Sequence, residues 1–221
     1  GDVVSPGTVI ITAAGNCNAI SKVVEPLFKL NAGPIYYINI SQDTFKLGGS
    51  AFGQILNTVG SETPNVQSAS YVKTVFNTLQ ELIKNDKIVA GHDVASGGLI
   101  TTLLELCFSD NALGADLNLD SLEEADSIKL LFSENSGIVF QAKDASVAAQ
   151  LSKASIAFHE LGTVTNHPIL NIKNASDNLA LNITKLRDVW YETSFLLDQK
   201  QTANGLANDR FENYKNQPLH Y

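Results

Sequence analysis

The stretch Val89-Ala90-Gly91-His92-Asp93-Val94-Ala95-Ser96-Gly97-Gly98-Leu99-Ile100 decides the fold class, because a β-type run in it breaks off and restarts as a helix. Residues 87–91 predict a short strand. Residues 99–108 predict a helix, since their apolar side chains recur at helical spacing. Strands that alternate with helices are the pattern of α/β folds, so the sequence favours that class.

The same turn has the composition of a phosphate and metal site. Gly97 and Gly98 fall at the N-terminus of the predicted helix, where backbone N–H groups and the helix dipole favour an anion. Asp93 offers a hard carboxylate oxygen of the kind that binds Mg²⁺ together with nucleotide phosphates. An ordinary strand-to-helix turn with Ser96 as N-cap explains the same residues, so the spacing alone leaves both interpretations open.

Composition indicates a globular protein. The chain has 221 residues, of which 44% are hydrophobic and 17% charged, so it can bury a sizeable core. No apolar stretch approaches the roughly 20 residues that a membrane-spanning helix needs. Its two cysteines, Cys17 and Cys107, form no Cys-x-x-Cys pair and fit a reducing compartment. We therefore expect a cytoplasmic protein without a membrane partner.

The formal net charge of −8 argues against nucleic acid as a partner, because binding to its backbone needs clustered Lys and Arg. Backbone amides and a metal ion act on phosphates at short range, whereas net charge is screened within about 8 Å at physiological ionic strength. The charge therefore excludes DNA and RNA but not ATP.

Strands and helices alternate along the sequence. The pattern predicts strands at residues 8–13, 35–40, 87–91, 115–119, 137–142, 157–164, 169–172 and 179–183. It predicts helices from residue 19, over residues 50–59, 70–85, 99–108 and 144–154, and from a capping-box match at Ser121 and Glu124 to residue 131. We expect an α/β (α+β) fold in which a layered mixed sheet carries its helices on one face.

The C-terminal part divides into a helix and a polar tail. Apolar spacing predicts a helix over residues 184–199 that docks by one face, with a partner interface centred on Trp190 as the alternative. Residues 199–221 are polar and lack periodicity, as in a linker. Because the chain lacks methionine and begins with Gly1, we expect a piece of a longer protein, with a domain over residues 1–198 and a linker over residues 199–221.

A second glycine cluster, Leu47-Gly48-Gly49-Ser50-Ala51-Phe52-Gly53, also leads into a predicted helix. It again places backbone amides at a helix N-terminus. The cluster matches neither the dinucleotide fingerprint nor the Walker loop, and a simple hinge explains it equally well.

Four stretches carry a resemblance to a known family. They are Leu47-Gly48-Gly49-Ser50-Ala51-Phe52, His92-Asp93-Val94-Ala95-Ser96-Gly97-Gly98-Leu99, Leu131-Phe132-Ser133-Glu134-Asn135-Ser136-Gly137 and Leu186-Arg187-Asp188-Val189-Trp190-Tyr191-Glu192-Thr193. In residues and order they resemble the phosphoribosylformylglycinamidine synthase family. The resemblance implies the C-terminal part of the second aminoimidazole ribonucleotide synthetase-like half of the long, single-chain form. Its implied partners are the β-rich half-domains and the glutaminase domain of the full-length enzyme.

The resemblance also implies a reaction. Such enzymes use ATP and Mg²⁺ to phosphorylate the amide oxygen of formylglycinamide ribonucleotide, and ammonia from glutamine then displaces the phosphate to give the amidine. The chain would thus be part of an ATP-dependent ligase of purine biosynthesis and inactive alone. Asp93 is implied to hold Mg²⁺, and the residues implied to bind ATP or ADP are Gly48, Gly49, Ser50, His92, Ser96, Gly97 and Gly98. No residue is implied to be catalytic, because this half is associated with an auxiliary nucleotide.

Two positions qualify the resemblance. Ser96 stands where many members carry an aspartate directly before the two glycines, which removes a second carboxylate from the implied metal site. Glu134 matches a family glutamate and is either a site residue or a structural cap.

Two other function classes compete with the ligase. A glutamine amidohydrolase is one, because residues 10–19 place Cys17 between a predicted strand and a predicted helix, as in a nucleophile elbow. Its general base would have to be His92, His159, His167 or His220, and none of them lies in a His-x-Glu arrangement. The other is a non-catalytic assembly module that binds partners through apolar surfaces such as the Trp190 helix.

Overall fold

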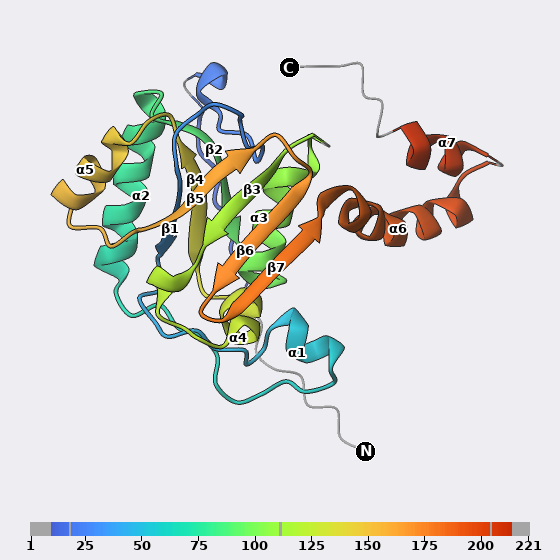
Figure 1. The fold of residues 1–221 in the computed structure, drawn as a ribbon, viewed down its shortest axis with the longest axis horizontal. Coiled ribbons are helices and arrows are strands. Elements are labelled where there is room, and N and C mark those ends of the chain that lie inside the picture. The colour runs from blue at the N-terminus through green and yellow to red at the C-terminus, as the bar shows by residue number, and fades with distance from the viewer. Residues whose placement is uncertain (1–9, 18, 111, 204, 214–221) are drawn as a thin grey trace.

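The computed structural model describes residues 10–17, 19–110, 112–203 and 205–213, in which a mixed sheet of seven strands is layered with helices (Figure 1). The strands are β1 (Ile35–Asn39), β2 (Ile88–Val94), β3 (Gly114–Asn118), β4 (Gly137–Ala142), β5 (His159–Thr165), β6 (Ile169–Asn174) and β7 (Asp177–Asn182). The helices are η1 (Ile20–Lys22), α1 (Ala51–Ile55), α2 (Ala69–Lys84), α3 (Gly98–Phe108), η2 (Asp120–Leu122), α4 (Ser127–Phe132), α5 (Ser146–Lys153), α6 (Ile183–Gln201) and α7 (Leu206–Asn213).

The strands lie in the order β2-β4-β1-β5-β3-β6-β7 across the sheet. Neighbouring strands are antiparallel, except that β3 and β6 run parallel. The predicted α/β class with a layered mixed sheet is therefore confirmed.

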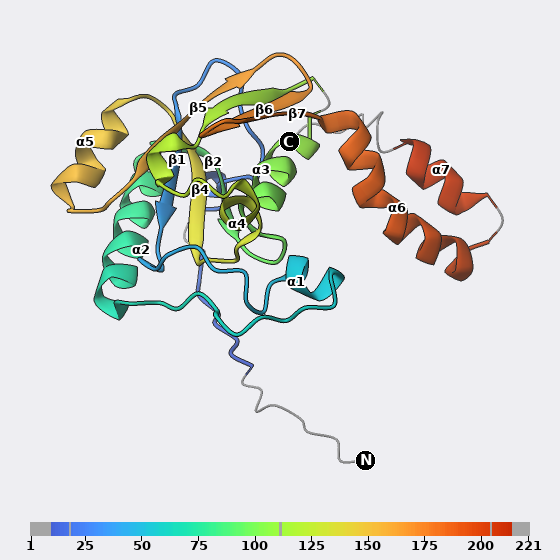
Figure 2. The ribbon, with the colours of Figure 1, turned by 60° about the horizontal axis from the view of Figure 1, so that its bottom comes forward.

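Helices cover both faces of the sheet around β1, where the sequence predicted one covered face. Tyr36 and Ile38 belong to an apolar cluster with residues of α2 and α5, whereas Ile35 and Tyr37 belong to a cluster with residues of α3 and α4. The reason is that successive side chains of a strand point to opposite faces. Figure 2 shows α2 and α5 on one side of the sheet and α3 and α4 on the other.

The half of the sheet formed by β3, β6 and β7 buries only one face. Leu117 of β3 and Leu170 and Ile172 of β6 pack into the cluster that contains α3. The alternating residues of these strands, such as Asp116 and Asn171, lie on the opposite face, which has no helix over it in Figure 1. This open face is polar because it meets solvent.

Most predicted elements are present with shifted ends, and one shift concerns the site. β2 extends beyond residue 91 to Val94, because Asp93 and Val94 pair with Ile138 and Gly137 of β4. His92 and Asp93 therefore lie in the strand, and the turn into α3 begins after them.

Two element predictions are wrong. Residues 10–13 form no strand, and residues 8 and 9 lie outside the described residues. The capping box at Ser121 does not form either, since Ser121 lies in η2. α4 begins only at Ser127, where the Asp126 carboxylate accepts from the N–H groups of Ile128 and Lys129 at 3.0 and 3.1 Å.

The C-terminal helix packs against the domain mainly by its beginning. Ile183 and Arg187 of α6 are buried, whereas Trp190 is 50% exposed. The segment predicted as a linker contains α7, which folds back on α6 through a Phe195–Phe211 stack with ring centroids 4.6 Å apart. The division of the chain at residue 198 stays a prediction.

Among the described residues, no helix combines the length and the apolar character that crossing a membrane requires.

Candidate functional site

The two glycine-rich turns meet at a single carboxylate. Gly97, before α3, donates its N–H to Oε1 of Glu134 at 2.8 Å. Ala51, in the first turn of α1, donates its N–H to the same oxygen at 2.8 Å. The backbone nitrogen atoms of Gly97 and Ala51 therefore lie no farther apart than twice 2.8 Å. The structure thus brings together two sites that the sequence placed separately, around a residue whose role the sequence left open.

The loop that carries Glu134 is fixed on both sides. Before it, Phe132 of α4 stacks on Phe52 of α1 with ring centroids 4.7 Å apart. After it, the buried Asn135 side chain donates to the Ser41 hydroxyl at 3.1 Å and to the Thr44 carbonyl at 3.0 Å. β4 begins three residues after Glu134, so this loop is also anchored to the sheet.

Two of the glycines are required by close approach of backbone segments. A Cβ on Gly98 would lie 2.7 Å from the carbonyl oxygen of Leu131, and φ at Gly98 is +75°. A Cβ on Gly48 would lie 2.2 Å from the carbonyl oxygen of Glu62. Only glycine fits such positions, so packing explains these residues without a ligand.

The backbone amides predicted to cradle phosphate already have acceptors within the chain. Their partners are carbonyl groups: Gly48 donates to Glu62, Gly49 to Val59, Ser50 to Leu47 and Gly98 to Ala95, at 2.7 to 3.2 Å. The Gly97 amide is held by Glu134. A phosphate that used these donors would have to displace an existing partner.

The two serine hydroxyls differ in accessibility. Ser50 is buried and caps α1, because its Oγ accepts from the Gly53 N–H at 3.2 Å and donates to the Leu47 carbonyl at 2.7 Å. Ser96 is exposed beside Gly97. Of the two, only Ser96 presents its side chain to solvent.

Asp93 and His92 lie at the end of β2, next to the turn. The Asp93 side chain is 78% exposed, and its Oδ1 lies 3.3 Å from Nδ1 of His92. The other ring nitrogen, Nε2, lies 3.1 Å from Oε2 of Glu105 on α3. Nδ1 also lies 2.7 Å from the backbone carbonyl of Asp93, so the His92 ring is fixed between this carbonyl and Glu105, while the Asp93 side chain remains open to solvent.

The described residues do not form a complete metal site. The described part of the chain holds no group of three or more His, Cys, Asp and Glu side chains arranged to bind a metal ion. Mg²⁺ is commonly bound through one or two carboxylates, with nucleotide phosphates and water as the other ligands. Asp93 fits the first of these roles, and the remaining ligands would come from outside the described residues.

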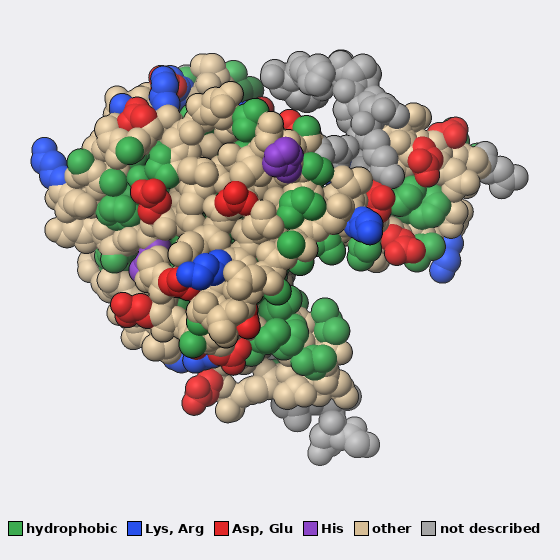
Figure 3. Space-filling model, in the orientation of Figure 1, with side chains coloured by type: hydrophobic (Ala, Val, Ile, Leu, Met, Phe, Trp, Pro, Cys, Tyr) green, Lys and Arg blue, Asp and Glu red, His purple; other side chains and the backbone are tan. Residues whose placement is uncertain are grey.

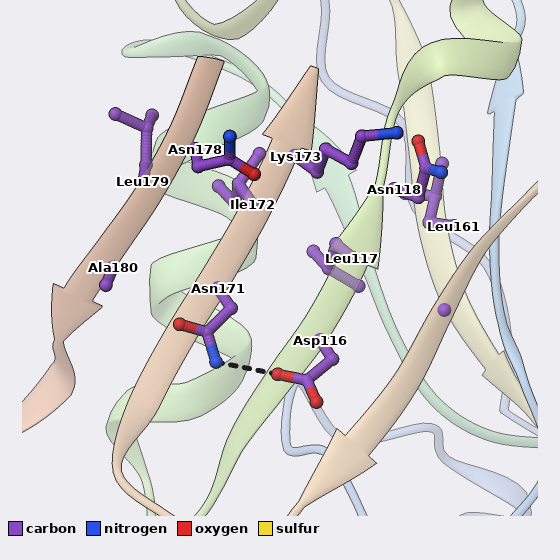
Figure 4. Close-up of a pocket in the computed structure, with 11 residues that line it drawn as sticks. Asp116, Leu117, Asn118, Leu161, Asn171, Ile172, Lys173, Asn178, Leu179 and Ala180 are labelled. Atoms are coloured by element: carbon purple, nitrogen blue, oxygen red, sulfur yellow. Dashed lines mark hydrogen bonds between the residues drawn. The ribbon is translucent and has the colours of Figure 1, made fainter. Parts of the chain in front are cut away.

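Two larger hollows lie elsewhere. One, of about 500 Å³, lies on the open face of β3, β6 and β7, where Asn171 donates to Asp116 at 2.7 Å (Figure 4). The other, of about 440 Å³, is lined in part by Asp43, Glu124 and His159. Neither is lined by the two glycine turns.

The pKa values of three groups that line the second hollow are lowered, but for different reasons. A hydrogen bond from the Lys46 ammonium lowers the pKa of the Asp43 carboxyl, and one from Lys129 lowers the pKa of the Glu124 carboxyl. Burial lowers the pKa of the His159 imidazole. Protonation of each of the three groups therefore opposes folding, and His159 is the one whose ordinary pKa, 6.5, is highest.

The nucleophile elbow considered as an alternative around Cys17 does not form. Residues 10–17 have no strand, and the helix that follows is η1, a single 3-10 turn. An elbow needs a strand that turns sharply into a helix to present its nucleophile. Cys17 is exposed on a segment without regular secondary structure, and His220 lies outside the described residues.

The comparison with protein families decides the membership of the chain. The model of the C-terminal domain of AIR synthase related proteins matches residues 42–173, which include both glycine turns and Glu134. The chain belongs to this family. AIR synthase is the aminoimidazole ribonucleotide synthetase to which the sequence analysis related the phosphoribosylformylglycinamidine synthases. The match therefore confirms the predicted resemblance for the domain that the two enzymes share.

Curated relatives of this AIR synthase related domain are much longer. A probable phosphoribosylformylglycinamidine synthase from Arabidopsis thaliana, named as chloroplastic/mitochondrial, is 33% identical over 91% of this chain and 15% of its own length. A probable phosphoribosylformylglycinamidine synthase from Caenorhabditis elegans is 31% identical over 91% of the chain and 17% of its own length. The chain therefore spans about a sixth of the relatives that it matches.

Solved structures show the same fold at low identity. PurL from Thermotoga maritima in complex with ATP matches 76% of this chain and 28% of its own, with a TM-score of 0.56 and 15% identity. Complexes of the same protein with ADP and with FGAR match comparably, with TM-scores of 0.57 and 0.59. At this identity the likeness supports the fold alone.

Sequence reasoning missed two contacts of the site. It did not predict that Glu134 joins the glycine turns, because the donors and the acceptor are far apart in the chain. It also missed Glu105, although a single carboxylate within the apolar helix α3 was a usable signal.

Proposed function

We propose that the chain is the C-terminal domain of the second synthetase-like half of a long-form phosphoribosylformylglycinamidine synthase. That enzyme is the ATP-dependent ligase that converts formylglycinamide ribonucleotide and glutamine into the amidine during de novo purine biosynthesis. The names of the two curated relatives support the proposal. The observation that carries it is the meeting of both glycine turns at Glu134, because it joins the sequence features on which the resemblance depends.

In this proposal the chain supplies part of an auxiliary Mg–nucleotide site and no catalytic group. Binding of ATP and of ADP by Thermotoga maritima PurL supports a nucleotide ligand. Asp93, exposed at the end of β2, is the proposed ligand of Mg²⁺, which neutralises charge on phosphate oxygens. The proposed nucleotide-binding residues are Gly48, Gly49, Ser50, His92, Ser96, Gly97 and Gly98.

The geometry refines how those residues would act. The N–H groups of Gly97 and Ala51 already converge on one anionic oxygen, so a phosphate oxygen could replace the Glu134 carboxylate there with the same two donors. Gly48, Gly49, Ser50 and Gly98 would shape the turns, since their amides are engaged within the chain. Ser96 would add an exposed hydroxyl.

The rest of the site would come from other domains. The chain spans about a sixth of its relatives, so we propose the β-rich half-domains and a glutaminase domain as its partners and expect no ligase activity from the chain alone. We retain the cytoplasm as the proposed location.

Titration of the ¹⁵N-labelled chain with Mg-ATP tests the nucleotide site. We expect the amide resonances of Gly97 and Ala51 to shift together, because both N–H groups would exchange Glu134 for a phosphate oxygen. The amide of Gly33 should stay in place, since it donates to Ala142 at the opposite end of β1. A module that serves only assembly would leave all three resonances unchanged.

Two matched variants test the metal ligand. Asp93→Asn should abolish the magnesium dependence of the shifts, because the amide cannot replace the hard carboxylate. Glu81→Gln removes another exposed carboxylate, on α2 across the sheet from α3, and should leave that dependence intact. Equal magnesium dependence in the parent and in Asp93→Asn would refute Asp93 as a ligand.

A substitution at Glu134 tests whether a phosphate oxygen replaces its carboxylate as the acceptor of the two N–H groups. Glu134→Gln keeps an oxygen that can accept from Gly97 and Ala51 but removes the negative charge that competes with phosphate. We expect it to bind Mg-ATP about tenfold more tightly, which isothermal titration calorimetry measures. Unchanged affinity would mean that nucleotide binds without displacing this carboxylate.

A further inference from the structure

β7 forms one edge of the sheet, and its outer side has no partner strand among the described residues. The other edge strand, β2, is partly covered, because the Gly91 N–H donates to the Glu25 carbonyl at 3.2 Å. An edge strand presents a row of backbone donors and acceptors to any strand that can reach it. Natural proteins usually protect such edges with charged side chains, proline or a bulge.

β7 lacks these protections over most of its length. Residues 178–182 contain neither a charged residue nor proline, and the register of β7 with β6 is continuous. The only charge in the strand is Asp177 at its beginning. The edge is therefore suited to pairing.

The sequence of the edge indicates what it pairs with. Asn178-Leu179-Ala180-Leu181-Asn182 reads identically in both directions. If two copies align antiparallel about Ala180, Asn178 of each lies opposite Asn182 of the other, and Leu179 lies opposite Leu181. Asp177 then lies opposite Ile183, so no like charges face each other across the pair.

The two faces of β7 agree with this alignment. Leu181 packs against the apolar cluster that contains α3, and Leu179 is on the same face of the strand. Asn178 and Ala180 line the open face that Figure 4 shows. Self-pairing would therefore match apolar with apolar side chains on the inner face and amide with amide on the outer face, the kind of cross-strand pairs that stabilise sheets.

We propose that the free edge of β7 pairs with β7 of a second copy of this chain. The two strands meet antiparallel about a two-fold axis at Ala180 and join the two sheets into one. Such an interface is isologous, because each copy contributes the same self-complementary surface. Main-chain hydrogen bonds provide the attraction, and the symmetric side-chain pattern fixes the register.

Light scattering coupled to gel filtration, over a series of chain concentrations, measures the association. The expected result is a mass that rises with concentration from the monomer value of 23.8 kDa toward twice that value. A mass that stays at the monomer value throughout the series overturns the proposal.

Two double variants test the register. Asn178→Asp with Asn182→Asp places like charges opposite each other twice in the dimer and should leave only monomer. Asn178→Lys with Asn182→Asp places opposite charges there and should retain the dimer. Both variants keep an oxygen acceptor for the Lys185 N–H, which Asn182 caps at 2.9 Å, so α6 keeps its N-cap.

Differences in the stability of the monomer cannot explain this expected difference in dimerisation between the two double variants. Asn178 is paired with Lys173 across β6 and β7, so an aspartate at position 178 suits the isolated chain and a lysine does not. Folding stability should thus follow the opposite order from dimerisation, and far-UV circular dichroism verifies that both variants are folded. If the two variants associate equally, the copies meet through another surface, such as the exposed side of α6, and the proposal fails.

Discussion

One oxygen atom of Glu134 accepts hydrogen bonds from two backbone N–H groups. The glycines of the two turns, Gly48 and Gly98, allow backbone segments to approach closely. The sequence predicted that Gly97 and Gly98 begin a helix, and this is confirmed by α3. It could not reveal which acceptors the amides find, because Glu134, Glu62 and Val59 reach the turns only through the tertiary fold. The assignment of these residues to a nucleotide therefore stays a proposal.

Gly98→Ala should destabilise the chain by about 3 kcal/mol. The new Cβ would meet the Leu131 carbonyl at 2.7 Å, and alanine resists a φ of +75°. Gly205→Ala is the matched control, since φ there is +90° but a Cβ meets no atom within 4 Å. It should cost about 1 to 2 kcal/mol. Urea unfolding of both variants measures the difference, and equal costs would contradict the packing explanation.

At the scale of elements, hydrophobic periodicity correctly predicted most strands and helices. The capping-box motif, in contrast, predicted the start of one helix at the wrong residue. Ser121 and Glu124 have the spacing of a capping box, yet the chain forms η2 there and α4 begins at Ser127. The Asp120 carboxylate explains the difference, because it accepts from the Ala175 N–H at 2.8 Å and ties this segment to the turn between β6 and β7. A tertiary contact thus overrides a local motif.

Asp126→Ala should lower the free energy of unfolding by about 1 kcal/mol, because the N–H groups of Ile128 and Lys129 lose their acceptor. Ser121→Ala should change it by less than about 0.5 kcal/mol, since no cap is lost. Chemical unfolding of the two variants distinguishes the observed cap from the predicted one. A larger effect at Ser121 would contradict the observed helix start.

At the scale of the molecule, the sequence predicted the class of the sheet but not its order. β4 lies between β2 and β1, and neither periodicity nor turn residues specify such a non-consecutive neighbour. Large apolar side chains also remain exposed, including Ile55 and Leu56 at the end of α1, where Figure 3 shows green atoms gathered at the lower right. Exposed apolar surface of this kind is typical of contact sites, as expected if other domains pack here.

The pH dependence of global stability should reflect His159. Burial lowers its pKa in the folded chain below the ordinary value of 6.5. Above that value the imidazole is neutral in both states, and as pH falls below it the unfolded chain gains a proton that the folded chain resists, so stability declines. Urea midpoints measured from about pH 7 to about pH 5 should fall less in His159→Gln than in the parent.

Carboxylates act in a different range. The pKa values of Asp43 and Glu124 are lowered from 3.8 and 4.5, so their contribution is present above those values and is lost only at lower pH. An equally steep decline of the midpoints in His159→Gln would exclude the imidazole as the cause.

The order of the strands has a consequence for biosynthesis. β1 and β2 are made early, but β2 pairs only with β4, and β1 pairs with β4 and β5. A nascent chain that ends before Gly137 therefore carries three strands, β1, β2 and β3, whose partner strands are not yet made. Such unpaired strands are prone to aggregate, so during translation β1 and β2 are exposed to this risk until β4 leaves the ribosome.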